Sequence, residues 1–109
     1  VIQSAVLVDY ALQSAPCELW LFDVTPAGLP ADNAAFTITD AAVLTCIGVI
    51  PFSTYYASAL NSVSYGLNMP IAFKCVGAAV KDIYGVLVTR GTPTYATGDI
   101  SIRLNISQD

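Results

Sequence analysis

Apolar and polar residues alternate along much of this chain, a pattern that predicts a protein built from β-strands. The clearest stretch is residues 99–107, where Ile100, Ile102, Leu104 and Ile106 are separated by single polar residues. A period of two residues is typical of a strand with one buried face. Other segments rich in Val, Ile, Phe and Tyr have the same character. The predicted strands are residues 2–10, 17–24, 48–56, 71–76, 83–89 and 99–107.

The segment 17–24 differs from the others because both of its faces are apolar. One face carries Cys17, Leu19 and Leu21, and the other carries Trp20, Phe22 and Val24. A strand with only one buried face would alternate with polar residues. We therefore expect this strand to be covered twice, by the core and by either a second layer or a partner chain.

The segments between the strands complete the predicted fold. Residues 25–33, with Pro, Gly, Asp and Asn, and residues 90–98, with Pro and Gly, have the composition of exposed loops. Thr39 or Asp40 can cap a short helix over residues 41–47. The pattern predicts an all-β fold, a single antiparallel β-sandwich domain over residues 1–109, with at most one short helix near residues 40–47. A jelly-roll-like arrangement is preferred to an immunoglobulin-like one, because a Cys-Trp-Cys signature is missing.

The composition indicates a domain that is partly covered by other proteins. Apolar residues make up 55% of the chain and charged residues 11%, with a net charge of −4. A monomer of this mass should expose about 5,800 Å², which few charged side chains are available to cover. The acidic balance argues against a nucleic-acid partner. The apolar run at residues 41–52 is too short for a membrane span of about 20 residues, so we expect no membrane partner.

Candidate chemistry is sparse. The chain has no His, which excludes Ser-His-Asp and Cys-His catalysis and imidazole zinc sites. Cys17, Cys46 and Cys75 lack a C-x-x-C pair and are expected to be three buried thiols in a protein folded in a reducing cytoplasm. The aspartates do not have the spacing of a calcium loop. We therefore expect no catalytic residue, no cofactor, no metal site and no enzymatic activity.

The aromatic residues are the better candidates for function. Tyrosine and tryptophan are enriched in protein interfaces because each side chain buries a large area and carries a polar group that can form a hydrogen bond. Tyr55 and Tyr56 are adjacent, so on a strand one of them should leave the core, and Tyr95 lies in a predicted exposed loop. Trp20 is a further candidate, although core packing explains it as well. The predicted protein-interface residues are Trp20, Tyr55, Tyr56 and Tyr95.

A series of short motifs in a fixed order extends over nearly the whole chain. They are Val6-Leu7-Val8-Asp9, Leu19-Trp20-Leu21-Phe22-Asp23 leading to Pro26, Asp32-Asn33-Ala34-Ala35-Phe36 with Asp40, Gly48-Val49, Asn68-Met69-Pro70, Leu87-Val88-Thr89-Arg90-Gly91-Thr92-Pro93-Thr94-Tyr95, Arg103-Leu104 and Gln108-Asp109. In these motifs and their order the chain resembles a family of small virion proteins encoded among the structural genes of tailed bacteriophages. The resemblance implies a further N-terminal segment. Because the chain begins with Val1, we expect either processing or a missing leading segment.

The resemblance implies a structural role in the phage particle, as a decoration or cement protein that binds the lattice of the major capsid protein and stabilises the head. The expected location is the capsid surface of the virion, after assembly in the host bacterial cytoplasm. Because association costs recur at each contact, we expect a dimer or trimer that engages several capsomers together. A tail or baseplate component and a carbohydrate-binding β-sandwich module are the alternatives.

Overall fold

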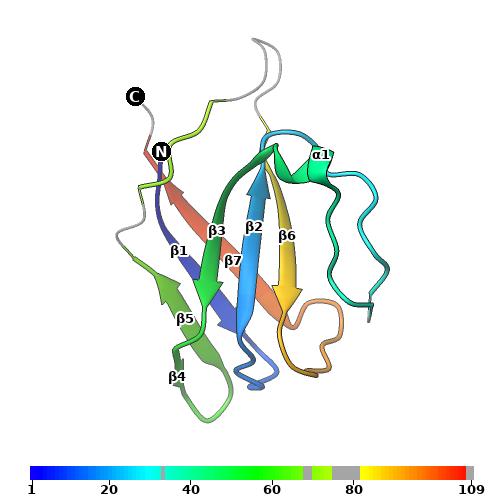
Figure 1. The fold of residues 1–109 in the computed structure, drawn as a ribbon. Coiled ribbons are helices and arrows are strands. Elements are labelled where there is room, and N and C mark those ends of the chain that lie inside the picture. Colours follow the sequence, from blue (N-terminus) through cyan, green and yellow to red (C-terminus); the bar gives the residue numbers. More distant parts are fainter. Residues whose placement is uncertain (33, 68–69, 75–81, 108–109) are drawn as a thin grey trace.

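The chain folds into two antiparallel sheets that pack face to face (Figure 1). The structure is a computed structural model, and it describes residues 1–109 except 33, 68–69, 75–81 and 108–109. In chain order the elements are β1 (Ile2–Asp9), β2 (Cys17–Phe22), α1 (Asp40–Val43), β3 (Cys46–Phe52), β4 (Tyr55–Ala57), β5 (Ser62–Gly66), β6 (Tyr84–Thr89) and β7 (Ile100–Ile106). The predicted fold class, a small antiparallel β-sandwich with one short helix, is confirmed.

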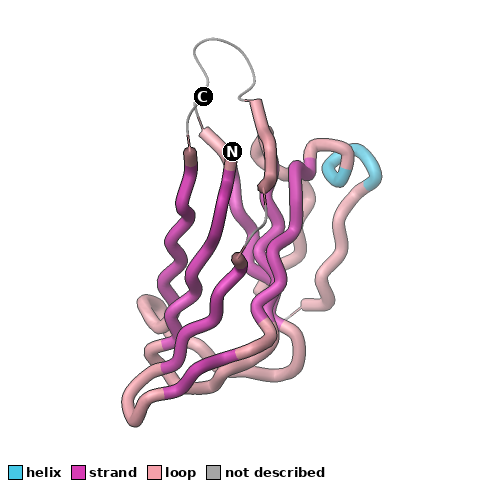
Figure 2. The backbone as a smooth tube through the Cα atoms, turned by 90° about the vertical axis from the view of Figure 1, so that its left-hand side faces the viewer, coloured by secondary structure: helices cyan, strands magenta, loops and turns pink. Residues whose placement is uncertain are grey.

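The first sheet has the strand order β4-β5-β1-β7. The first strand of the chain therefore lies between β5 and the last strand, β7 (Figure 2). Val6 of β1 lies opposite Tyr65 of β5 and Arg103 of β7. Since successive side chains of a strand point to opposite faces, Val6 and Val8 face outward while Ala5 and Leu7 face the second sheet.

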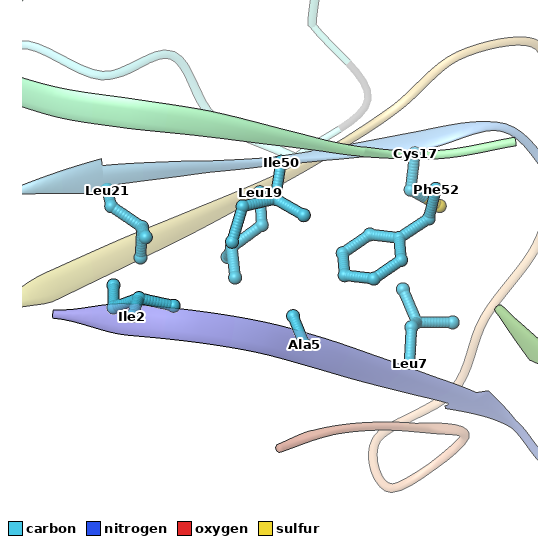
Figure 3. Packing of buried hydrophobic residues seen from close by; sticks show 8 residues of the cluster. All are labelled: Ile2, Ala5, Leu7, Cys17, Leu19, Leu21, Ile50 and Phe52. Atoms are coloured by element: carbon cyan, nitrogen blue, oxygen red, sulfur yellow. The ribbon is translucent and has the colours of Figure 1, made fainter. Parts of the chain in front are cut away.

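The second sheet has the strand order β3-β2-β6. Leu19 of β2 lies opposite Ile50 of β3 and Leu87 of β6, and these side chains face the first sheet. The core lies between the two sheets, where side chains of β2 and β3 point toward those of β1 (Figure 3). Its buried members are Ile2, Ala5, Leu7, Cys17, Leu19, Leu21, Ile50 and Phe52.

The prediction that β2 is covered on both faces is confirmed by residues 23–32 and 34–39. These residues lie on the outer side of the second sheet and lead into α1 (Figure 2). The ring centroid of Phe36 lies 5.0 Å from that of Trp20, and Phe22 has no exposed surface. A second layer from the chain itself therefore covers the outer face of β2.

The helix is shorter than predicted. Of the two candidate caps, Thr39 is the N-cap, because its Oγ1 accepts a hydrogen bond from the backbone N–H of Ala42 at 3.1 Å. The helix ends at Val43, and Cys46 already pairs with Phe22 in the second sheet. The helical prediction for residues 44–47 is wrong because residues 44–45 form a turn and sheet pairing begins at Cys46. No helix among the described residues is long and apolar enough to cross a membrane.

The strand predictions need three corrections. The predicted strand 48–56 is two strands in different sheets, β3 and β4, with a break at residues 53–54. In the predicted strand 71–76, Ile71 forms an isolated bridge with Ile2, residues 72–74 are not in a strand, and residues 75–76 lie outside the described residues. Strand β5 was not predicted. Asn33, Asn68, Met69, Cys75, Gln108 and Asp109, which belong to predicted features, also lie outside the described residues.

Candidate interaction surface

Tyr55 and Tyr56 lie on opposite faces of β4, as predicted. Tyr55 packs against the core, and its hydroxyl donates a hydrogen bond to the carbonyl oxygen of Ala15 at 2.7 Å. Tyr56 points away from the core and is 66% exposed. The two residues therefore serve different purposes: Tyr55 holds the β1–β2 loop, and Tyr56 is available for contact with another molecule.

The outer face of the first sheet brings Tyr56 together with a second exposed tyrosine. Tyr65 of β5 is 48% exposed, and its ring centroid lies 6.5 Å from that of Tyr56. In the sheet register, Tyr56 lies opposite Val63, which lies opposite Val8. We call this outer face the tyrosine face; its residues are Ser4, Val6, Val8, Tyr56, Val63, Tyr65, Ser101, Arg103 and Asn105.

The tyrosine face carries little charge. Among the strand residues that form it, Arg103 is the single charged one. Val6, Val8 and Val63 are half-buried between their neighbours, so the most exposed apolar area belongs to the two tyrosines. A patch with exposed aromatic residues and few charges has the composition of an interface core.

Trp20 lies on the outer face of the other sheet and does not join the tyrosine face. Its Nε1–H donates to Glu18 Oε1 at 3.1 Å, and the same oxygen accepts from Arg90 Nη2 at 2.8 Å. The bonds from Arg90 and Trp20 lower the pKa of Glu18. The indole thus has a polar partner and an aromatic neighbour within the chain. Its role in an interface stays a prediction.

Tyr95 lies in the β6–β7 loop but is half-buried rather than exposed as expected. Its hydroxyl donates a hydrogen bond to Asp9 Oδ2 at 2.8 Å. Burial and this bond raise the pKa of Tyr95 to about 12. The ring is held at the end of the sandwich because it satisfies a buried carboxylate, a partner that loop composition does not reveal. An interface role for Tyr95 likewise stays a prediction.

Asp9 is a structural centre that sequence reasoning missed. It has no exposed surface, and its carboxylate accepts hydrogen bonds from the backbone N–H groups of Ala11 at 2.9 Å, Gln13 at 3.1 Å and Ser14 at 2.8 Å. These bonds hold a loop in which Leu12 and Ser14 have left-handed φ angles of 55° and 51°. A signal was present, because Asp9 continues the inward positions of Ala5 and Leu7. An inward carboxylate at a strand end needs several donors.

The ionisable groups near Asp9 form contacts within the folded chain. The four donors on Asp9 occupy its carboxylate oxygens. Burial raises the pKa of the Cys17 thiol, which favours the protonated form, and burial also raises the pKa of Tyr55. Cys17 is buried as predicted, whereas Cys46 is only half-buried. The described residues contain no group of three or more Cys, Asp or Glu side chains that could hold a metal ion.

The free energy of unfolding should fall as the pH rises from about 10 to about 12. The pKa of Tyr95 is raised from 10.0 to about 12 in the folded chain, so above pH 10 the unfolded chain loses a proton that the folded chain keeps. The stabilisation is complete below pH 10 and is lost as the pH passes 12. Urea unfolding across this range measures it. Tyr95→Phe should show a shallower decline, and equal slopes for the two proteins would contradict the assignment.

Comparisons with protein-family models, with curated proteins and with solved structures find no match to this chain.

Proposed function

We propose that this chain is a non-enzymatic structural protein of a tailed-bacteriophage virion, one that decorates the head by binding the lattice of the major capsid protein. The resemblance of its ordered motifs to small phage virion proteins supports the proposal from the sequence. The observation that carries it in the structure is the tyrosine face, an aromatic surface with one charged strand residue on the outer side of the first sheet.

The size of the tyrosine face indicates how such a protein would bind. Two tyrosines of about 200 Å² each, exposed by 66% and 48%, offer roughly 230 Å², which corresponds to about 6 kcal/mol at about 25 cal/mol per Å². Association costs about 4–15 kcal/mol. One pair of tyrosines therefore gives little net affinity, so stable attachment requires further contacts or several linked copies.

The internal chemistry is consistent with a structural role. Asp9 is surrounded by four hydrogen-bond donors and organises two loops at one end of the sandwich. The β1–β2 loop is further tied to the β6–β7 loop, because the backbone N–H of Thr94 donates to Gln13 Oε1 at 2.9 Å. These bonds hold the two loops in one arrangement, and groups that are ordered beforehand lose less conformational entropy on binding.

Replacing both exposed tyrosines should abolish attachment without unfolding the protein. The test uses purified heads of the phage that encodes the chain, assembled without it, and measures co-sedimentation with added protein. Tyr56→Ala combined with Tyr65→Ala should weaken binding at least about tenfold, since both rings leave the contact. Leu44→Ala is the matched control, because Leu44 is 85% exposed but is the C-cap of α1, outside the tyrosine face. Equal loss in both variants would contradict the assigned surface.

The location of the protein in the particle tests the function itself. Gold-labelled antibody against the chain, viewed on intact phage by electron microscopy, should mark the head surface. Label on the tail or baseplate would replace head decoration with the tail role. Particles without label and without the protein by mass spectrometry would overturn the virion assignment.

A further inference from the structure

The four sheet edges of this sandwich differ in how well they are protected against pairing with another strand. Strand β4 has three residues, β3 contains Pro51 and a register shift against β2, and β6 contains Gly85. Short length, proline and bulges are features that discourage edge pairing, and an interior glycine weakens a strand. Strand β7 has seven residues and neither proline nor glycine.

The open edge of β7 is also regular. In the part of the chain that the structure describes, β7 pairs with β1 alone, and Figure 2 shows it at the margin of its sheet as the strand that leads to the C-terminus. Its register against β1 is unbroken from Ile100 to Asn105. A long, regular edge strand presents a row of unpaired backbone groups to any matching strand.

The hydrogen-bond pattern shows which residues present these groups. The backbone N–H of Tyr10 donates to the carbonyl oxygen of Asp99 at 2.8 Å. Hydrogen-bonded pairs alternate along an antiparallel ladder, so Ser101 and Arg103 direct their backbone groups toward β1. Ile102 and Leu104 consequently direct their N–H and C=O groups outward.

We infer that the β7 edge binds the β7 edge of a second copy of this chain, in antiparallel register, and joins two four-stranded sheets into one of eight strands. A two-fold axis at Leu104 places the outward groups of Ile102 opposite those of Ile106. The backbone donors and acceptors are then self-complementary, as a symmetric dimer requires. The half-buried Ile102 and Leu104 side chains meet their counterparts on the inner face, so the apolar layer continues across the interface.

Charge argues against one neighbouring register. Arg103 is the single charged residue of β7, and a two-fold axis at Arg103 would place two guanidinium groups directly opposite each other, which destabilises a strand pair. With the axis at Leu104, each Arg103 lies opposite Asn105 of the second copy instead. The same register covers part of Ile106, which is 52% exposed in the single chain.

This dimer does not depend on the proposed function but would extend it. Because the two sheets become continuous, the tyrosine faces of both copies lie on the same side of one sheet. Two linked faces would bind a repetitive lattice with a higher effective concentration than one.

Sedimentation equilibrium of the isolated protein in the micromolar range tests the dimer. The natural chain should dimerise, and Asn105→Lys should weaken dimerisation about tenfold or more, because it places Lys opposite Arg103 in both halves of the interface. Ser4→Lys is the matched control: it adds the same charge on β1, one strand from the edge, and removes the same hydrogen bond, from Asn105 Nδ2 to Ser4 Oγ at 2.7 Å. A natural chain that stays monomeric throughout this range would overturn the inference.

Amide hydrogen exchange of the unmodified protein supplies a second readout that needs no variant. The Ile102 and Leu104 amides should exchange fast in dilute monomer and slowly in the dimer, whereas the Ser101 and Arg103 amides are protected in both. Continued protection of Ser101 and Arg103 in Asn105→Lys also shows that the variant is folded. A dimer in which Ile102 and Leu104 still exchange fast would place the interface elsewhere and refute the β7 pairing.

Discussion

Asp9→Ala should lower the free energy of unfolding by about 3–5 kcal/mol. The substitution removes the acceptor of three backbone N–H groups and of the Tyr95 hydroxyl. Because Asp9 is fully buried, water cannot replace the carboxylate without opening the end of the sandwich. The loop with left-handed Leu12 and Ser14 would then lose the bonds that hold it. Urea denaturation at neutral pH measures the loss.

Two variants separate the contributions to the Asp9 centre. Tyr95→Phe removes one donor and keeps the carboxylate, so it should cost about 1–2 kcal/mol. Asp9→Asn keeps an acceptor for Ala11 but replaces the oxygen that Gln13, Ser14 and Tyr95 share, so it should lie between Tyr95→Phe and Asp9→Ala. If Asp9→Ala were no more destabilising than Tyr95→Phe, the loop would be held by other contacts.

Phe52→Ala should also lower the free energy of unfolding by about 3–5 kcal/mol, the range for a buried phenylalanine that leaves a cavity. Phe52 has no exposed surface and points from β3 toward Leu7 of the facing sheet (Figure 3). A small domain has about 5–15 kcal/mol of stability in all, so the variant should lose a large part of it. Urea denaturation measures the loss.

Val49 supplies the control for Phe52. It lies on the same strand but is 40% exposed, so Val49→Ala should change the free energy of unfolding by about 0.5 kcal/mol or less. Similar losses at both positions would mean that the core does not lie between the two sheets at β3.

The tyrosine face and the β7 edge belong to one sheet, so the proposed attachment and the proposed dimer are compatible with each other. One sandwich offers a modest apolar area, and pairing at β7 would double it without any new residue type. The proposed cement function would then depend on repeated weak contacts. It would tolerate a small interface on each copy, provided that the copies are held together.

The sequence pattern was sufficient for those elements in which the structure uses the residues as the pattern indicates. The alternation of Ile100, Ile102 and Leu104 predicted β7, and the Thr39 hydroxyl was one of two predicted helix caps. Strand β5 was missed because its alternation is inverted: Ser62 and Ser64 are buried, while Val63 and Tyr65 face outward. That register is stable because Ser62 lies opposite Asp9, and Ser14 Oγ donates to Ser62 Oγ at 3.0 Å.

The candidate surface was predictable only in part. Adjacent tyrosines on a strand must point to opposite faces, so the exit of one of them from the core followed from the sequence. The pairing of β4 with β5 decides that Tyr56 is the tyrosine that points away from the core. The same pairing places Tyr65 beside Tyr56. Tyr95 differs, because the sequence places it in a loop that was expected to be exposed. In the structure its hydroxyl donates to the buried carboxylate of Asp9, 86 positions away in the sequence.

The sequence by itself determined the all-β class, the alternating strands, the capping of the helix and the scarcity of catalytic groups. These follow from residue type and from spacing along the chain, which act over a few residues. Tertiary structure decided the division of residues 48–56 between two sheets, the inward serines of β5, the bond from Tyr95 to Asp9 and the open edge of β7. Each of these depends on which strands become neighbours, and that choice minimises the free energy of the whole sandwich rather than of any one segment.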